Sequence, residues 1–130
     1  MYKWVKAYLH NRRARVHLDG RKSKKVLLRH GVPQGGVLSP TLFLVYINDL
    51  VAELPHGIKM AMYADDLVIW CTEEHATVAT KQIQRAIDAL TLWANRWCVS
   101  INTDKCSTTV LTLSSKQKVG AIKIDGELLK

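Results

Sequence analysis

The sequence has few of the residues that characterise disulfide-rich, zinc-binding or membrane-spanning proteins. Its 130 residues include an odd number of cysteines, Cys71, Cys98 and Cys106, and no C-x-x-C pair. Neither a disulfide framework nor a zinc site is therefore indicated, and we expect an intracellular protein of the cytoplasm or nucleus. No apolar run reaches the roughly 18 residues that a membrane helix needs, so no membrane partner is expected.

Acidic residues are almost missing from the first thirty positions. Residues 1–30 contain ten Lys and Arg against one acid, Asp19, whereas residues 31–130 contain nine Lys and Arg against ten acids. The net charge of +8 therefore arises mainly from one end of the chain. Such an excess favours a polyanionic partner. On charge alone, an ordinary solvated surface explains it equally well.

The basic region has the pattern of a hairpin. After a short helix over residues 1–11, basic and apolar side chains alternate from Arg13 to Leu18, which predicts a half-buried strand with a basic outer face. Asp19-Gly20 predicts a turn, and residues 24–30 predict the return strand. The candidate contacts to a nucleic-acid backbone are Arg13, Arg15, Lys24 and Lys25.

A glycine-rich loop follows, and it leads into a helix. Residues 31–36 read G-V-P-Q-G-G, which excludes a regular helix or strand. Ser39 is a natural N-cap and Pro40 suits the first helical position, so we expect a helix from Pro40 to about Glu53. Its predicted buried residues are Leu42, Phe43, Tyr46, Ile47 and Leu50. A glycine loop before a helix can bind phosphate, or it can be a plain connector.

The stretch M-A-M-Y-A-D-D-L-V-I-W-C places two adjacent carboxylates between apolar runs. We expect a tight hairpin of strands 58–63 and 67–71 with residues 64–66 at its tip, buried on both faces. Asp65 and Asp66 would repel each other unless a cation offsets them. Mg²⁺, with Mn²⁺ as an alternative, is the natural partner because it prefers oxygen ligands. A solvated turn is the alternative interpretation.

The rest of the chain, from residue 72 onward, contains both helix and strand signals. Residues 72–98 predict a long amphipathic helix, with its apolar face marked by residues such as Ile83, Leu90 and Trp97. Residues 108–113 predict a strand, with Lys105 near its entry. Asp125-Gly126 predicts a turn between two further short apolar segments, residues 122–124 and 127–129. The chain stops just after an apolar pair, and so looks like a piece of a longer protein.

Taken together, these motifs resemble those of reverse transcriptases. G-V-P-Q-G-G-V-L-S-P at residues 31–40 is similar to the family's template-gripping motif, and Y-A-D-D at residues 63–66 to its catalytic hairpin. I-N-T-D-K at residues 101–105 is similar to the next motif of the family. The residues of these motifs are most similar to those of reverse transcriptases from non-long-terminal-repeat retrotransposons. Gly36 differs from this pattern, because many of those enzymes have Ser or Cys at the corresponding position.

The resemblance implies an α+β fold, a partial polymerase palm of antiparallel sheet with helices on one face. It assigns residues 1–30 to the fingers side and residues 31–130 to the palm. The upstream strand that carries a further catalytic aspartate, and the downstream thumb, are absent from these 130 residues. The fold is therefore expected to be a fragment of the polymerase domain.

The resemblance also implies roles for individual residues. It makes Asp65 and Asp66 catalytic ligands of Mg²⁺, and Lys105 either a catalytic lysine that acts on the leaving pyrophosphate or an ordinary surface residue. The residues implied near the template and nucleotide are Pro33, Gln34, Gly35, Gly36 and Tyr63. The implied partners are an RNA template, a DNA primer and deoxynucleoside triphosphates.

The implied function is RNA-directed DNA polymerisation by the parent protein, through two-metal nucleotidyl transfer. One carboxylate pair on one turn cannot easily bridge both ions, so we expect the 130-residue chain to be inactive alone. A non-catalytic nucleic-acid-binding module, or an exapted remnant, is the competing interpretation, and the basic first thirty residues support it. An inactive structural fragment is the third.

Overall fold

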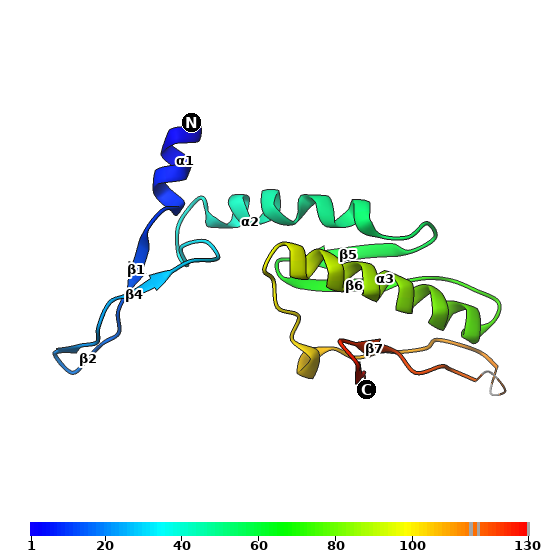
Figure 1. Ribbon diagram of the computed structural model, residues 1–130. Coiled ribbons are helices and arrows are strands. Elements are labelled where there is room, and N and C mark those ends of the chain that lie inside the picture. The colour runs from blue at the N-terminus through cyan, green and yellow to red at the C-terminus, as the bar shows by residue number, and fades with distance from the viewer. Residues whose placement is uncertain (115, 117, 130) are drawn as a thin grey trace. The chain divides into compact units, whose positions relative to one another are not determined.

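The computed structural model describes residues 1–114, 116 and 118–129, which form two compact units, Met1–Ile47 and Asn48–Lys130. Figure 1 labels most of their helices and strands. The first unit contains two helices and a basic hairpin built from two short strand pairs. Its elements are α1 (Tyr2–Leu9), β1 (Arg12–Ala14), β2 (His17–Leu18), β3 (Arg21–Lys22), β4 (Val26–Leu28) and α2 (Ser39–Ile47).

The basic hairpin is formed as the sequence predicts, with more interruptions. β1 pairs antiparallel with β4, and β2 with β3. At the tip, Asp19 and Gly20 have φ of 47° and 74°, the left-handed pair that a tight hairpin turn prefers. The predicted half-burial is wrong, because Val16 and Leu18 are 68% and 69% exposed. Each of these sheets has only two strands among the described residues, so the apolar side chains stay largely exposed.

The helix α2 begins at Ser39, slightly earlier than predicted. The Leu42 N–H bonds to the Leu38 carbonyl oxygen, so the first helical turn starts one residue before the expected cap. The Ser39 hydroxyl donates to the Pro33 carbonyl oxygen, and therefore closes the preceding loop. After Ile47 the chain continues in the second unit as a 3₁₀ helix, η1 (Asn48–Glu53). The α-helix therefore ends six residues before the predicted end at Glu53. The predicted apolar face is confirmed in part: Ile47 and Leu50 are buried, whereas Leu42, Phe43 and Tyr46 are half-buried.

The second unit contains one long helix and two hairpins. Its other elements are β5 (Lys59–Tyr63), β6 (Asp66–Trp70), α3 (Ala76–Arg96), the 3₁₀ helix η2 (Thr103–Lys105), β7 (Lys123–Ile124) and β8 (Glu127–Leu128). Among the described residues every sheet has two antiparallel strands, so the fold is a mixed α+β arrangement. No helix in the described ranges is long and apolar enough to cross a membrane.

The apolar face of α3 forms the core of the second unit. Ile87 packs with Ile122 and Ile124 near the C-terminal hairpin, and Ile69 of β6 packs against the same cluster. Polar contacts join the far end of α3 to η1. Trp93 Nε1 donates to Asp49 Oδ1 at 3.1 Å, and a 2.8 Å ion pair joins Arg96 to Glu53. The expectation of helices packed against the sheet is confirmed for α3, which packs with Ile69 of the central hairpin formed by β5 and β6. For α2, which lies in the other unit, it stays a prediction.

The end of α3 uses a left-handed residue that is not glycine. The Val99 N–H bonds to the Ala94 carbonyl oxygen and the Cys98 N–H to that of Asn95, which is the Schellman pattern. Cys98, with φ of 56°, occupies the position that glycine usually takes. The sequence therefore contains no glycine signal for this helix end, although residues 72–98 predict its approximate position.

The C-terminal segment agrees with the sequence only in its last hairpin. Asp125 and Gly126 have φ of 49° and 86°, and they join β7 to β8 as predicted. The strand predicted over residues 108–113 is wrong for the described residues, because Val110 and Leu111 form no ladder and both are exposed. An apolar run becomes a strand only where another strand pairs with it, and no described segment does.

Candidate functional site

The two strands of the central hairpin have different faces. The register pairs Met60 with Ile69 and Met62 with Leu67, and directly opposed residues share one face. Met60, Met62 and Ile69 are partly buried, so this face is directed toward the core of the unit. The opposite face carries Lys59, Ala61, Tyr63, Asp66, Val68 and Trp70.

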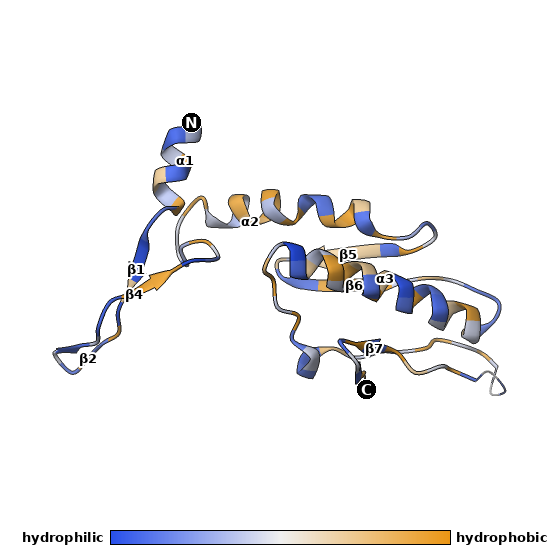
Figure 2. Cartoon of the chain, in the orientation of Figure 1, coloured by the Kyte–Doolittle hydropathy of each residue, from blue (hydrophilic) through white to orange (hydrophobic). Residues whose placement is uncertain are grey.

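That opposite face is open, contrary to the predicted burial on both sides. Tyr63 is 85% exposed and Val68 is 60% exposed. Figure 2 shows hydrophobic residues over only part of β5, next to a hydrophilic stretch, and the sheet has only two strands in the described chain. The expectation fails because apolar composition shows what a strand can bury, whereas burial requires a neighbour that is not among the described residues.

Asp65 and Asp66 occupy different positions in the hairpin. Ala64 and Asp65 form the two-residue connection, whereas Asp66 already belongs to β6 and pairs with Tyr63. The prediction that Asp66 lies at the tip is therefore corrected by one residue. Both carboxylates are exposed, and neither forms a hydrogen bond or ion pair with another described side chain. Both are available to a ligand that comes from outside the unit.

The turn contains backbone strain beside the carboxylates. Ala64 has φ of 53°, a left-handed conformation that costs a residue with a Cβ about 1–2 kcal/mol. Ala64→Gly should remove this cost while adding some freedom to the unfolded chain, for a net rise in the free energy of unfolding of about 0.5 kcal/mol. Urea unfolding of the 130-residue chain measures it.

The matched control for the turn is Ala61→Gly, in the neighbouring strand. Ala61 has no left-handed strain to relieve, so the substitution should lower the free energy of unfolding by about 0.5–1 kcal/mol. If Ala64→Gly lowers stability as much as Ala61→Gly does, the turn is not strained.

The carboxylate pair is a partial donor set for a divalent cation. Asp65 and Asp66 provide hard oxygen ligands of the kind that Mg²⁺ and Mn²⁺ prefer. Within residues 1–114, 116 and 118–129, no cluster of three His, Cys, Asp or Glu side chains is arranged to hold a metal ion. The pair fits such an ion as two of its ligands, and further ligands would have to come from water, substrate or other protein segments.

Lys105 lies in η2, a 3₁₀ turn, and not at the entry of a strand as predicted. Its backbone N–H bonds to the Asn102 carbonyl oxygen, and its side chain is exposed. No hydrogen bond or ion pair joins Lys105 to Asp65 or Asp66, all three of which the structure describes. Its role therefore stays a prediction.

The glycine-rich loop is a closed turn with an exposed tip. The Gly36 N–H donates to the Pro33 carbonyl oxygen at 3.3 Å, which defines a turn over Pro33–Gly36. Gly35 has φ of 76°, the left-handed geometry that the third residue of a type II turn requires. Gln34 and Gly35 are exposed, and nothing lies within 4 Å of where a Cβ on Gly35 would be. A ligand can therefore approach this backbone closely.

Two residues hold this loop that the sequence alone did not identify. Arg12 donates to the carbonyl oxygens of His30 and Gly31, at the entry of the loop. The Tyr8 hydroxyl lies 3.4 Å from Ser39 Oγ, at its exit. Neither contact has a local sequence signal, because 18 to 31 residues separate the partners.

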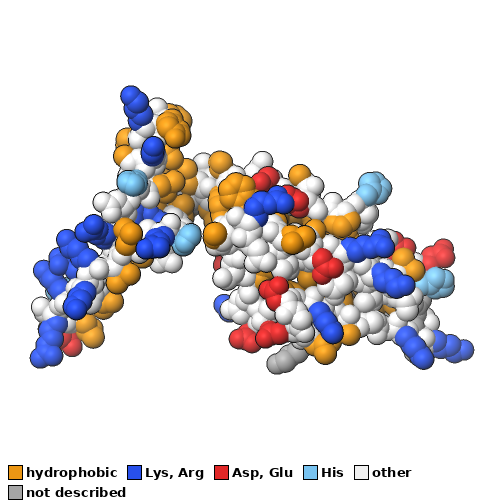
Figure 3. Space-filling view, in the orientation of Figure 1, with side chains coloured by type: hydrophobic (Ala, Val, Ile, Leu, Met, Phe, Trp, Pro, Cys, Tyr) orange, Lys and Arg blue, Asp and Glu red, His pale blue; other side chains and the backbone are white. Residues whose placement is uncertain are grey.

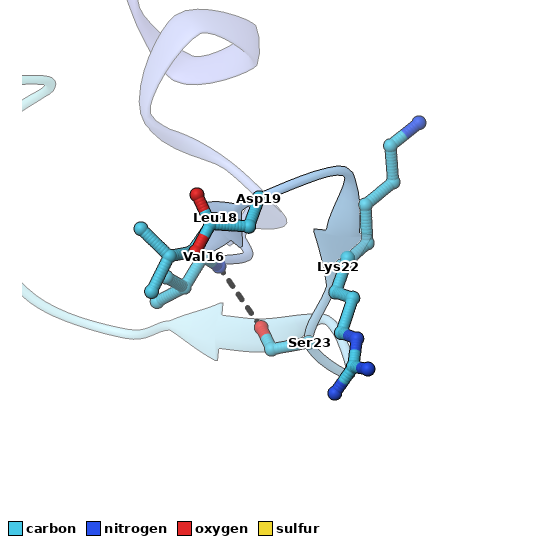
Figure 4. A pocket seen from close by; sticks show the side chains of 6 residues that line it. Val16, Leu18, Asp19, Lys22 and Ser23 are labelled. Carbon is cyan, nitrogen blue, oxygen red and sulfur yellow. Dashed lines mark hydrogen bonds between the residues drawn. The ribbon is translucent and has the colours of Figure 1, made fainter.

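The basic hairpin carries the predicted cations on its surface. Arg13, Arg15, Lys24 and Lys25 are all exposed, and Figure 3 shows Lys and Arg side chains gathered over this part of the unit. Near the tip is a surface hollow, in which the Val16 N–H donates to Ser23 Oγ at 2.9 Å (Figure 4). Its lining residues are Val16, Leu18, Asp19, Arg21, Lys22 and Ser23. An exposed cationic hairpin of this kind suits a phosphate backbone.

One cysteine beside the central hairpin is protected. Burial, and secondarily the charge of Glu73, raise the pKa of the Cys71 thiol above its usual value. Because the thiolate is the reactive form, iodoacetamide at pH 8 should alkylate exposed Cys98 several times faster than Cys71. Peptide mass spectrometry over time measures both rates, and equal rates would contradict the protected environment.

The raised pKa of Cys71 also makes the stability of the protein depend on pH. The folded state holds the Cys71 proton more tightly than the unfolded state does. The contribution to stability is therefore complete below the ordinary thiol pKa, and it is lost as the pH rises through the raised value. Cys71→Ala should remove this alkaline loss.

The chain is similar to a known protein family over most of its length. Residues 1–122 match the family described as "Reverse transcriptase (RNA-dependent DNA polymerase)". The chain is 32% identical over 136 residues to "RNA-directed DNA polymerase from mobile element jockey" of Drosophila melanogaster, which covers 100% of the chain. It is 33% identical over 135 residues to the protein of that name from Drosophila funebris, covering 99% of the chain.

A third relative is "Probable RNA-directed DNA polymerase from transposon BS" of Drosophila melanogaster, 32% identical over 136 residues and covering 98% of the chain. The chain spans only 15% of the length of each of these three relatives. No solved structure matches the chain significantly. Since the family match covers nearly all of the sequence, the chain belongs to the reverse transcriptase (RNA-dependent DNA polymerase) family.

Proposed function

We propose that this chain is part of an RNA-directed DNA polymerase of a non-long-terminal-repeat retrotransposon. The observation that carries the proposal is the exposed Asp65–Asp66 pair at the turn of the central hairpin, in a chain whose family and relatives are polymerases by name. In this proposal residues 1–30 belong to the fingers side and residues 31–130 to the palm. The substrates are an RNA template, a DNA primer and deoxynucleoside triphosphates.

The proposed roles follow from donor chemistry. Asp65 and Asp66 hold Mg²⁺, since carboxylates at an open turn can reach an ion bound to substrate. The family resemblance implies that Asp65 is the direct ligand. Bound Mg²⁺ supplies charge neutralisation at the transferring phosphate. Gln34 and Gly35 offer a turn backbone to the template or nucleotide, and Pro33, Gly36 and Tyr63 complete those contacts. Lys105 is a cation for the leaving pyrophosphate.

Primer extension tests the proposal. A longer chain that includes sequence upstream of Met1 and downstream of Lys130 should extend a DNA primer on an RNA template, with an absolute requirement for Mg²⁺ or Mn²⁺. The 130-residue chain should not, because one carboxylate pair cannot clamp both ions. No extension by a folded longer chain that binds primer–template, or extension by the 130-residue chain alone, would contradict these roles.

A second candidate function is nucleic-acid binding without catalysis. The exposed cations of residues 1–30 favour it, and they need no metal to act. The longer chain distinguishes the two functions: binding of primer–template with no extension under any divalent ion supports the binding module.

A further inference from the structure

Arg12 differs from the other cations of the basic region. Its Nε atom donates to the Leu9 carbonyl oxygen at 3.4 Å, and its Nη2 atom donates to the carbonyl oxygens of His30, at 2.8 Å, and Gly31. No other Lys or Arg side chain within residues 1–30, all of which are described, forms a hydrogen bond or ion pair. Arg12 therefore ties the end of α1 to the entry of the glycine-rich loop.

Arginine suits this task better than lysine. Its planar guanidinium presents five N–H donors in a fixed fork, so that one side chain can bond several carbonyl oxygens at once. These donors are directed into the protein backbone. They are therefore less available to a nucleic-acid phosphate than those of Arg13, whose side chain is free on the surface.

Tyr8 holds the other end of the loop. Its ring stacks on Trp4 one helical turn earlier, with 5.2 Å between ring centroids and 10° between planes. The stacking sets the direction of the ring, and the hydroxyl then reaches Ser39 Oγ. The Ser39 hydroxyl in turn donates to the Pro33 carbonyl oxygen, which also accepts the Gly36 N–H. This chain of contacts fixes the base of the turn.

Gly36 is the position where this packing is tightest. A Cβ on Gly36 would collide with the Tyr8 hydroxyl and would lie 2.7 Å from Ser39 Oγ. The Tyr8 hydroxyl therefore occupies the space that a side chain at position 36 would need. Gly35, one residue away, faces open space, so the crowding is confined to the base of the turn.

We propose that Arg12 and Tyr8 are positioning residues of the Gly31–Gly36 loop: Arg12 fixes its entry and Tyr8 its exit, so that Gln34 and Gly35 are presented to the nucleic acid in one conformation. The proposal rests on the proposed function in one respect, the identity of the ligand. The holding of the loop is independent of it. The two parts are therefore tested by separate measurements.

The first measurement is amide hydrogen exchange of the Gly36 N–H in the free 130-residue chain, followed by NMR. Arg12→Lys keeps the positive charge but removes the planar set of guanidinium N–H donors. It should accelerate this exchange about tenfold. Arg13→Lys is the matched control and should leave it unchanged, because Arg13 bonds to no part of the loop. Unchanged exchange in Arg12→Lys overturns the positioning role.

A double-mutant cycle tests Tyr8. Gly36→Ala should accelerate loop exchange, because the new methyl group displaces the Tyr8 hydroxyl. Tyr8→Phe removes the colliding atom, so the double variant Tyr8→Phe/Gly36→Ala should exchange more slowly than Gly36→Ala alone. A general loss of folding would not be rescued in this way. Additive effects would show that Tyr8 and Gly36 are not coupled, against the proposal; Tyr2→Phe in the same helix is the control.

The last measurement is binding of an RNA–DNA hybrid at several salt concentrations. Arg12→Lys should weaken binding about tenfold without changing the salt dependence, because its effect passes through the loop. Arg12→Gln should likewise leave the slope unchanged. A slope reduced by about 1, as for Arg13→Gln, would make Arg12 a phosphate contact and overturn the proposal. Faster exchange with unchanged binding would instead contradict the proposed ligand of the loop.

Discussion

Asp65→Asn is expected to reduce primer extension by the longer chain by about 10³-fold or more, with folding intact. Asparagine keeps the size and shape of the side chain but loses the charge that holds a divalent ion against the transferring phosphate. Asp65 lies in an exposed turn and bonds to no described side chain. The substitution should therefore leave the free energy of unfolding nearly unchanged. Single-turnover extension with saturating Mg²⁺ measures the chemical step.

Two further substitutions make the Asp65 result specific. Asp66→Asn should reduce extension less, about tenfold, because Asp66 lies within β6 and acts beside the direct ligand. Asp19→Asn is the matched control, an exposed aspartate in another hairpin turn, and should leave extension within about twofold, in line with an ordinary surface substitution. Full activity of Asp65→Asn, or an equal loss in Asp19→Asn, would remove Asp65 from the catalytic site.

The turns and the long helix could be predicted because their signals are local. Asp19-Gly20 and Asp125-Gly126 both adopt the left-handed pair that such dipeptides favour. The apolar spacing of residues 72–98 predicted α3 to within a few residues. The Y-A-D-D stretch also gave the correct hairpin, with a register error of one residue at Asp66.

The burial of the strands could not be predicted, because it depends on which segments lie beside them. Val68 in the central hairpin and Leu18 in the basic hairpin are apolar residues in strands, yet both are exposed because each sheet has only two strands in the described chain. Leu111 belongs to an apolar run that forms no strand, because no described segment pairs with it. Composition alone indicates which surfaces can be buried, and the partner decides whether they are.

The supports of the glycine-rich loop were also out of reach of the sequence. Tyr8 and Arg12 looked like members of a short helix and of a basic run. Their contacts with Ser39 and Gly31 connect segments far apart along the chain. The motif predicted that the loop exists, whereas only the fold identifies the side chains that hold it.

Replacing Arg13, Arg15, Lys24 and Lys25 together by Gln is expected to weaken binding of an RNA–DNA hybrid by about 10²–10³-fold at 0.1 M salt. All four side chains are exposed on the basic hairpin and none bonds to another described side chain. Each cation that neutralises a phosphate releases about 0.9 counterion, so the slope of log affinity against log salt should become shallower by up to about 3–4. Fluorescence anisotropy with the 130-residue chain measures both quantities.

A second set of four substitutions separates a local contact from a general charge effect. Lys59, Lys81, Arg85 and Lys123 are exposed cations of the second unit, and their replacement by Gln changes the net charge equally. If the basic hairpin binds the backbone, this control should change the slope by less than about 1, since net charge alone acts weakly through salt-screened solvent. Affinity should also be similar for two unrelated hybrid sequences, because phosphate contacts carry no base information. Equal losses in both sets would show that the hybrid recognises overall charge and not the hairpin, and a loss confined to the control set would place the binding face in the second unit.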